Sequence, residues 1–142
     1  MSKRIFVSLP VADLDRAELF YEAIGAVNNP MFTDETAACM VFSDEIHVML
    51  LTHDKFRQFT DKSIADSGAC EVLLCVSEAS REAVDAITDK AIAAGGREPR
   101  EPQDMGFMYS RSFEDPDGHV WEPAYMDMTA AQAAMGSRLE TA

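Results

Sequence analysis

The feature that most constrains the fold is an order of elements that occurs twice along the chain. Residues 4–11 (RIFVSLPV) are rich in apolar and β-branched side chains and predict a strand. A helix follows, which Asp13 can cap and Gly25 can end. Two apolar runs, residues 37–43 and 46–52, predict further strands. The first half therefore predicts a strand, a helix, a short or irregular strand and then two strands.

The same order returns after a polar bridge. Residues 71–77 (EVLLCVS) predict a strand, and Ser80 can cap a helix that ends at Gly95. Residues 107–114 and 119–126 predict two more strands. The second half thus repeats the elements of the first.

This repetition predicts an α+β fold made of two βαβββ modules, residues 4–53 and 70–127. A chain of 142 residues is long enough for one domain with a substantial core, which we place at residues 1–127. The remaining residues, 128–142, are weakly helical and are predicted to form a peripheral tail.

Charge and cysteine content limit the partners and the compartment. The 25 acidic and 12 basic residues give a net charge of −13, which disfavours nucleic acid and anionic membranes as partners. The N-terminus does not resemble a signal peptide, and no apolar run is long enough to span a membrane. Cys39, Cys70 and Cys75 are predicted to be buried, reduced thiols. We expect a cytoplasmic protein.

Glu122 is a charged residue in a predicted strand whose neighbouring side chains are apolar. Asp115-Pro116-Asp117-Gly118 predicts a type I turn, and the strand that follows contains Glu122. By the alternation of a strand, Glu122 shares a face with Val120 and Ala124, both apolar. A charged group on such a face needs either a functional or a structural reason.

Several stretches resemble a known family. PVADLDRAELFYEAIGA (10–26) followed by FEDPDGHVWE (113–122) is similar to the vicinal oxygen chelate superfamily, which includes glyoxalase I, bleomycin-resistance proteins and extradiol dioxygenases. The stretches 32–52 and 100–122 resemble, more narrowly, bacterial proteins called predicted lactoylglutathione lyases. The resemblance implies two βαβββ modules that form a bowl-shaped mixed sheet, a small-molecule ligand and a homodimer.

In metal-using members of the family, the first and last strand of each module supply the ligands. Carried over by position, these places fall on Phe6, Leu50, Glu71 and Glu122. The first two cannot bind a metal, so we predict no tightly bound metal or other cofactor. Glu71 and Glu122 alone would hold Mn²⁺ or Mg²⁺ only weakly.

Without a cation, two neighbouring glutamates among apolar side chains would share a proton and could act in general acid–base catalysis. We therefore name Glu71 and Glu122 as candidate catalytic residues. Alternatively, both accept structural hydrogen bonds, for which Tyr109, Arg111 and Tyr125 are the candidate donors.

The remaining positions near the cleft are candidate substrate-binding residues: Phe6, Ser8, Leu50, Met105, Phe107, Tyr109 and Arg111. The enzyme hypothesis is a lyase or isomerase that acts on a small carbonyl or 2-oxo compound through the glutamate pair. The alternative is a protein that sequesters a small molecule without a metal and without turnover. Dioxygenase chemistry is disfavoured, because the set of two histidines and one carboxylate that it requires is not present at these positions.

Overall fold

The computed structural model describes the backbone of residues 3–141 and the side chains of residues 3–136. Residue 1, where the predicted domain begins, and residue 142, where the predicted tail ends, lie outside the described residues. No helix among the described residues is long and apolar enough to cross a membrane.

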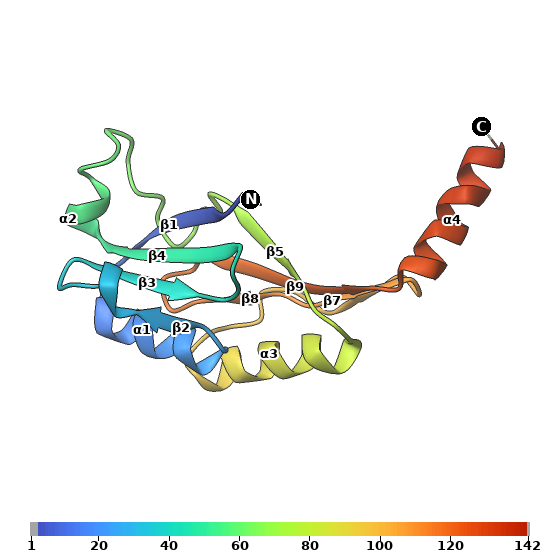
Figure 1. Ribbon diagram of the computed structural model, residues 1–142, viewed down its shortest axis with the longest axis horizontal. Coiled ribbons are helices and arrows are strands. Elements are labelled where there is room, and N and C mark those ends of the chain that lie inside the picture. Colours follow the sequence, from blue (N-terminus) through green and yellow to red (C-terminus); the bar gives the residue numbers. More distant parts are fainter. Residues whose placement is uncertain (1–2, 142) are drawn as a thin grey trace.

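The predicted α+β fold of two βαβββ modules is confirmed, as two mixed sheets of four and five strands (Figure 1). The first module contains β1 (Ile5–Val11), α1 (Leu14–Ala23), β2 (Val27–Asn29), β3 (Ala37–Val41) and β4 (Ile46–Thr52), with a short 3-10 turn, η1 (Pro30–Phe32), before β3. Its strand order is β1-β4-β3-β2, and β1 runs parallel to β4.

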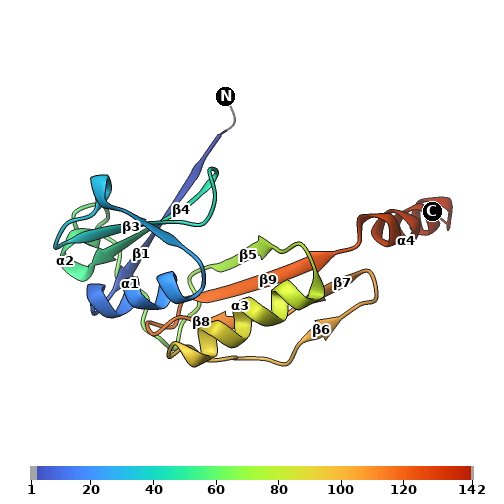
Figure 2. The ribbon, with the colours of Figure 1, turned by 60° about the horizontal axis from the view of Figure 1, so that its bottom comes forward.

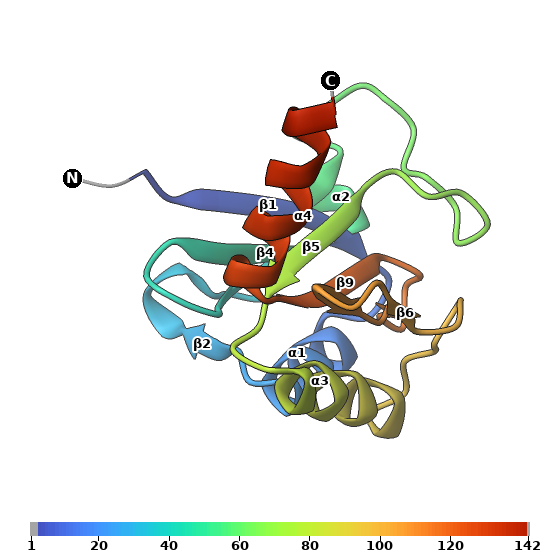
Figure 3. The ribbon, with the colours of Figure 1, turned by 90° about the vertical axis from the view of Figure 1, so that its right-hand side faces the viewer.

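The second module repeats this topology. It contains β5 (Leu73–Ser77), α3 (Arg81–Ala93), β6 (Gln103–Asp104), β7 (Met108–Ser110), β8 (Phe113–Glu114) and β9 (Val120–Met126). Its order is β5-β9-β7-β6, with β5 parallel to β9 and β8 also paired with β9. The short helix α2 (His53–Phe56) and a long segment connect the modules (Figure 3). Helix α4 (Met128–Thr141) leaves the end of β9 and extends away from both sheets (Figures 1 and 2).

Local signals in the sequence account for these boundaries. Asp13 Oδ1 accepts a hydrogen bond from Arg16 N at 3.1 Å, and Ser80 Oγ accepts one from Ala83 N at 3.0 Å, so both predicted caps are confirmed. The strand predicted at 107–114 is split into β7 and β8. The break lies opposite Pro123, which has no N–H to donate to the sheet ladder.

The core lies where the helices cover the sheets. Helices α1 and α3 pack side by side on the same side of the two sheets (Figures 1 and 2). Tyr21 of α1 and Trp121 of β9 are almost fully buried, and their rings meet edge to face at 6.0 Å. The core therefore joins the two modules.

Of the three cysteines, only Cys39 is buried as predicted. Cys70 precedes β5 and is exposed. Cys75 is exposed because Leu74 and Val76, its neighbours in the alternation of β5, are the residues that pack on the core. All three are free thiols.

Candidate functional site

Each sheet has one face that the helices leave uncovered, which we call the open face. In the first module, the register of β1 and β4 places Phe6 opposite His47 and Ser8 opposite Met49 on this face. In the second, Leu73 stands opposite Val120 and Cys75 opposite Glu122. The residues that alternate with them, among them Val48, Leu50 and Trp121, are buried in the core. The side chains on the open faces do not take part in the core and are therefore available to contact a ligand.

Leu50 was wrongly predicted to line the cleft. It is fully buried in the core, because Val48 and Leu50 point toward the helices and His47 and Met49 point away. The positions carried over to Leu50 and Glu122 are therefore not equivalent in the two sheets, since Leu50 is a core position and Glu122 an open-face position.

Phe6 lies on the open face as predicted, and its side chain is 55 % exposed. Its ring stacks on His47, with the ring centroids 4.4 Å apart and the planes inclined by 20°. The two rings form a flat aromatic surface against which a second planar group could stack.

Glu122 lies on the open face of the second sheet and pairs with an arginine that the sequence did not indicate. Arg100 Nη2 donates to Glu122 Oε2 at 2.5 Å, and both side chains are partly exposed. The guanidinium supplies the countercharge for this carboxylate. Across the strand pair, burial and the Glu122 charge raise the pKa of the Cys75 thiol.

Glu71 lies just before β5 and pairs with His119. The Nδ1 of His119 lies 2.5 Å from Glu71 Oε1, and its Nε2 lies 2.7 Å from the carbonyl oxygen of Pro10. Pro10 belongs to the first module and His119 to the second. The ring of His119 therefore links the two modules through these two contacts, and it is almost fully buried.

A buried polar chain continues from His119. The backbone N–H of His119 donates to Asp115 Oδ1 at 2.9 Å, and the Tyr21 hydroxyl donates to Asp115 Oδ2 at 2.7 Å. Trp121 Nε1 in turn donates to the Tyr21 hydroxyl oxygen. Burial raises the pKa of the Asp115 carboxyl, and burial together with Asp115 raises that of Tyr21. These bonds satisfy the side-chain polar groups of Asp115, Tyr21 and Trp121.

The two glutamates are thus engaged separately, and neither is bonded to the other in the structure. Glu71 binds an imidazole and Glu122 binds a guanidinium. The mutual repulsion that would make them share a proton is relieved by these two partners. Their catalytic roles stay predictions, but the specific pairing on which we based those roles is not present.

The same geometry does not fit a metal centre. Phe6 has no donor atom, Leu50 lies in the core, and each glutamate already has a basic partner. No group of three or more His, Cys, Asp and Glu side chains in the described part of the chain is placed to hold a metal ion. The weak binding of Mn²⁺ or Mg²⁺ by Glu71 and Glu122 stays a prediction, and no chemical step is assigned to a metal.

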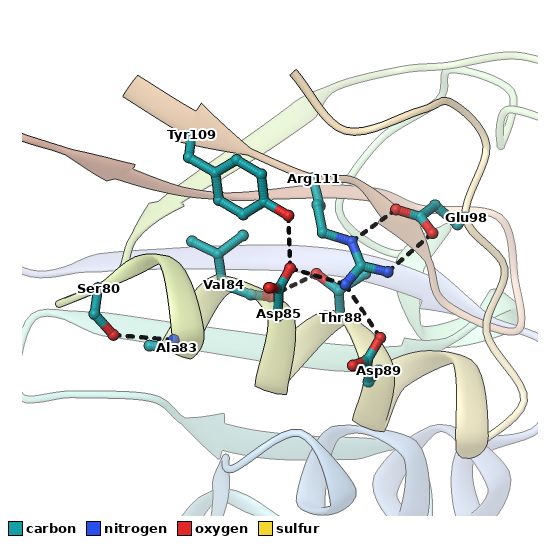
Figure 4. A network of polar contacts seen from close by, with 9 residues as sticks. All are labelled: Ser80, Ala83, Val84, Asp85, Thr88, Asp89, Glu98, Tyr109 and Arg111. Carbon is teal, nitrogen blue, oxygen red and sulfur yellow. Dashed lines mark hydrogen bonds and ion pairs between the residues drawn. The ribbon is translucent and has the colours of Figure 1, made fainter. Parts of the chain in front are cut away.

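Tyr109 and Arg111 do not reach the open face. Their side chains project toward α3, as Figure 4 shows. The Tyr109 hydroxyl donates to Asp85 Oδ1 at 2.6 Å, and Arg111 binds Asp85, Asp89 and Glu98 at 2.9–3.1 Å. The hydrogen bond from Tyr109 is the main reason why the pKa of Asp85 is lowered, and Arg111 adds to it. The prediction that Tyr109, Arg111 or Tyr125 donates to the glutamates is therefore not met.

The other candidate binding residues are spread over the surface. Ser8 and Glu71 line one apolar pocket of about 320 Å³ together with Phe56. Met105 is exposed, and its backbone N–H donates to the carbonyl of Met108 at 2.8 Å. Phe107 lies in a separate apolar groove with Met126 and residues of α4. Of the predicted set, the structure therefore brings together Ser8 and Glu71 at one pocket, and Tyr109 and Arg111 at Asp85, away from the open face.

Two residues that sequence reasoning missed belong to the open face. Cys75 could have been found from the alternation of β5, since Leu74 and Val76 are the inward-facing residues of that strand. Arg100 lies in the irregular segment between α3 and β6, where no periodicity indicates the direction of a side chain.

Comparisons with known proteins agree with this architecture. Residues 71–122 match the Glyoxalase/Bleomycin resistance protein/Dioxygenase superfamily. A hypothetical protein from S. aureus is 25 % identical, with a TM-score of 0.74 over 88 % of this chain and 94 % of its own. A glyoxalase/bleomycin resistance protein/dioxygenase family enzyme from Burkholderia phytofirmans PsJN is 19 % identical, with a TM-score of 0.73 over 88 % of this chain and 99 % of its own. A glyoxalase-related enzyme from Fulvimarina pelagi is 20 % identical, with a TM-score of 0.73 over 88 % of each chain. No curated protein matches this chain.

Proposed function

We propose that this chain, a member of the glyoxalase/bleomycin resistance/dioxygenase superfamily, binds a small and largely apolar molecule on its open faces and holds it without converting it. The observation that carries the proposal is the composition of these faces. Phe6, Met49, Leu73 and Val120 are apolar, and the charge of Glu122 is already balanced by Arg100. Such a surface favours binding by contact and stacking over proton transfer.

A homodimer would complete the binding site. Strands β1 and β5 are each the edge of a sheet, and the apolar side chains of Ile5, Phe6, Val72 and Leu73 are exposed along them. Small-molecule sites enclose most of their ligand, whereas a single open face covers only one side of it. We infer that a second copy covers the other side and buries these edges.

The remaining properties follow from charge and cysteine state. A net charge of −13 supports partners other than nucleic acid or anionic membranes. The free thiols of Cys39, Cys70 and Cys75 support a reducing compartment such as the cytoplasm.

Calorimetric titration tests the binding function, with a small planar aromatic compound such as 2-naphthol as the first probe, because the Phe6–His47 stack offers a flat aromatic surface. Phe6→Ala should weaken binding about tenfold, since it removes the stacking surface. Phe32→Ala is the matched control, because Phe32 is 58 % exposed but lies in η1, away from the open face. Equal losses in both variants would contradict the assignment of the site.

A lyase or isomerase that uses Glu122 is the second candidate. The observation that favours it is the position of Glu122, whose carboxylate lies on the open face and is not covered by the core. The hemithioacetal of methylglyoxal and glutathione is the substrate that the resemblance suggests. Turnover by the wild type and its loss in Glu122→Gln would establish this function, because an amide cannot accept the proton. Binding without turnover would support sequestration.

A further inference from the structure

A pocket of about 440 Å³ lies where the two modules meet, on the side of the linking segment 57–72. We call it the seam pocket. It is lined by residues of both modules and of the linking segment, among them Ala12, Arg16, His53, Arg57, Ser67 and Asp117. The open-face residues discussed above do not line it, so it is separate from the proposed binding site.

Two hydrogen bonds between the modules fix the walls of the seam pocket. The backbone N–H of Ala12 donates to Asp117 Oδ1 at 2.8 Å, and His119 Nε2 lies 2.7 Å from the carbonyl oxygen of Pro10. Ser67 of the linking segment packs closely on Gly118, in the turn before β9. A Cβ added at Gly118 would lie 3.3 Å from the Cα of Ser67. Gly118 permits this approach and has a φ of +89°. The pocket is therefore shaped by fixed contacts.

Two arginines with spare hydrogen-bonding capacity line the pocket, beside the carboxylates of Asp66 and Asp117. Arg16 makes only a long ion pair with Asp117, at 3.6 Å. Arg57 makes one exposed contact with Asp54, at 3.3 Å. A guanidinium has five N–H donors, so both arginines can still bind a carboxylate or a phosphate.

Asp117 supplies the complementary acceptor. Its side chain is only 9 % exposed, and its Oδ1 accepts the bond from Ala12. Its Oδ2 is buried and has no hydrogen-bond partner within residues 3–136. A buried acceptor without a donor costs free energy, and a hydroxyl group that reached it would recover that cost.

We propose that the seam pocket binds a small organic anion that also carries a hydroxyl group, such as a hydroxy acid or a hydroxylated phosphate ester. The anionic group contacts Arg16 and Arg57, and the hydroxyl group donates to Asp117 Oδ2. The proposal does not depend on the ligand of the open faces.

The test is an NMR titration of the full-length, ¹⁵N-labelled protein with D-glycerate, L-lactate and glycerol 3-phosphate. At least one of them should shift the amide signals of Ala12, His53 and Ser67 in a saturable way. Propionate lacks the hydroxyl group and glycerol lacks the charge, so each should bind about tenfold more weakly or not at all. If none of the three hydroxylated anions gives saturable shifts, the proposal is wrong.

Three variants separate specific binding from a general effect of charge. Arg57→Gln should weaken binding about tenfold. Arg97→Gln removes the same charge from another exposed arginine with one ion pair, outside the seam pocket, and should leave binding unchanged. Asp117→Asn keeps an acceptor for Ala12 but replaces Oδ2 by a donor, so it should abolish the preference for hydroxylated anions. An equal loss in Arg57→Gln and Arg97→Gln, or an unchanged preference in Asp117→Asn, would refute the site.

Discussion

The imidazole of His119 and the carboxylate of Glu71 form a short pair, with 2.5 Å between Nδ1 and Oε1. The other ring nitrogen, Nε2, faces the carbonyl oxygen of Pro10. Each nitrogen must carry a proton to bond to its acceptor, so the arrangement is best satisfied by the imidazolium form. A cation is thereby held between the two modules.

We predict that the pKa of His119 is raised above its usual value of 6.5. Burial alone would lower it, but Asp115, the Pro10 carbonyl and Glu71 outweigh burial. The Cε1–H signal of His119, followed by NMR against pH, measures this pKa directly. Glu71→Gln should lower it, whereas the exposed control Glu101→Gln should not change it. An equal pKa in the wild type and in Glu71→Gln would contradict the pairing.

The same group makes stability depend on pH. Because the pKa in the folded state is higher than in the unfolded state, the stabilisation by His119 is complete below pH 6.5. It is lost as the pH rises through the raised pKa of the folded state. In the wild type, the free energy of unfolding measured with urea should fall as the pH rises from 6.5 through the raised pKa of His119. In Glu71→Gln, the part of the fall that is due to His119 should begin at the same pH but be smaller and end at a lower pH, because only the pKa in the folded state is lowered.

Glu122→Gln should destabilise the protein slightly, by about 0.5–1 kcal/mol. A proton-sharing pair with Glu71 would have predicted no loss or a gain, but the observed partner is Arg100, which the substitution leaves without its countercharge. A double-mutant cycle with Arg100→Gln measures the coupling, which should decrease as salt is added because both side chains are partly exposed. A gain in stability would support the shared proton instead.

Arg111→Gln should be far more damaging, by about 2–4 kcal/mol. Arg111 is 12 % exposed and balances Asp85, Asp89 and Glu98, which would then repel one another. Arg111→Lys should lie in between, because an ammonium group keeps the charge but loses the planar fork. Denaturant midpoints give the order, with the exposed Arg97→Gln as the control expected to change little.

In solution, we expect a mass of twice 15.7 kDa at micromolar concentration. Leu73→Asp places a charge on the exposed edge strand β5 and should shift the mass toward the monomer. Leu19→Asp introduces the same charge at an exposed leucine of α1 and should leave the dimer intact. Sedimentation equilibrium distinguishes these outcomes, and a monomeric wild type would contradict the dimer.

The fold could be predicted because its signals are local. Caps such as Asp13 and Ser80, and apolar runs of strand length, depend on neighbours within a few residues. The order of these elements then permitted one simple repeated topology. The site could not be predicted to the same extent, since Arg100 reaches Glu122 across 22 positions from an irregular segment.

Strand parity was the specific source of error at Leu50. Alternation separates the residues of a strand into two sets, but it does not say which set faces the helices. Leu50 was assigned to the open face, but its set faces the helices, and the other set, which includes His47, lies on the open face. The same parity, applied to β9, would have excluded Tyr125 as a donor to Glu122, because odd-numbered residues there face the core side.

Cys75 and Glu122 stand opposite each other on the open face, and burial and the neighbouring charge both raise the pKa of the thiol. The thiolate is the reactive form of cysteine, so this sulfur is a poor nucleophile at neutral pH. A bound aldehyde or other electrophile would therefore be attacked by this sulfur only slowly. A low reactivity of Cys75 toward an electrophilic ligand would suit the proposed function, in which the molecule is held and released unchanged.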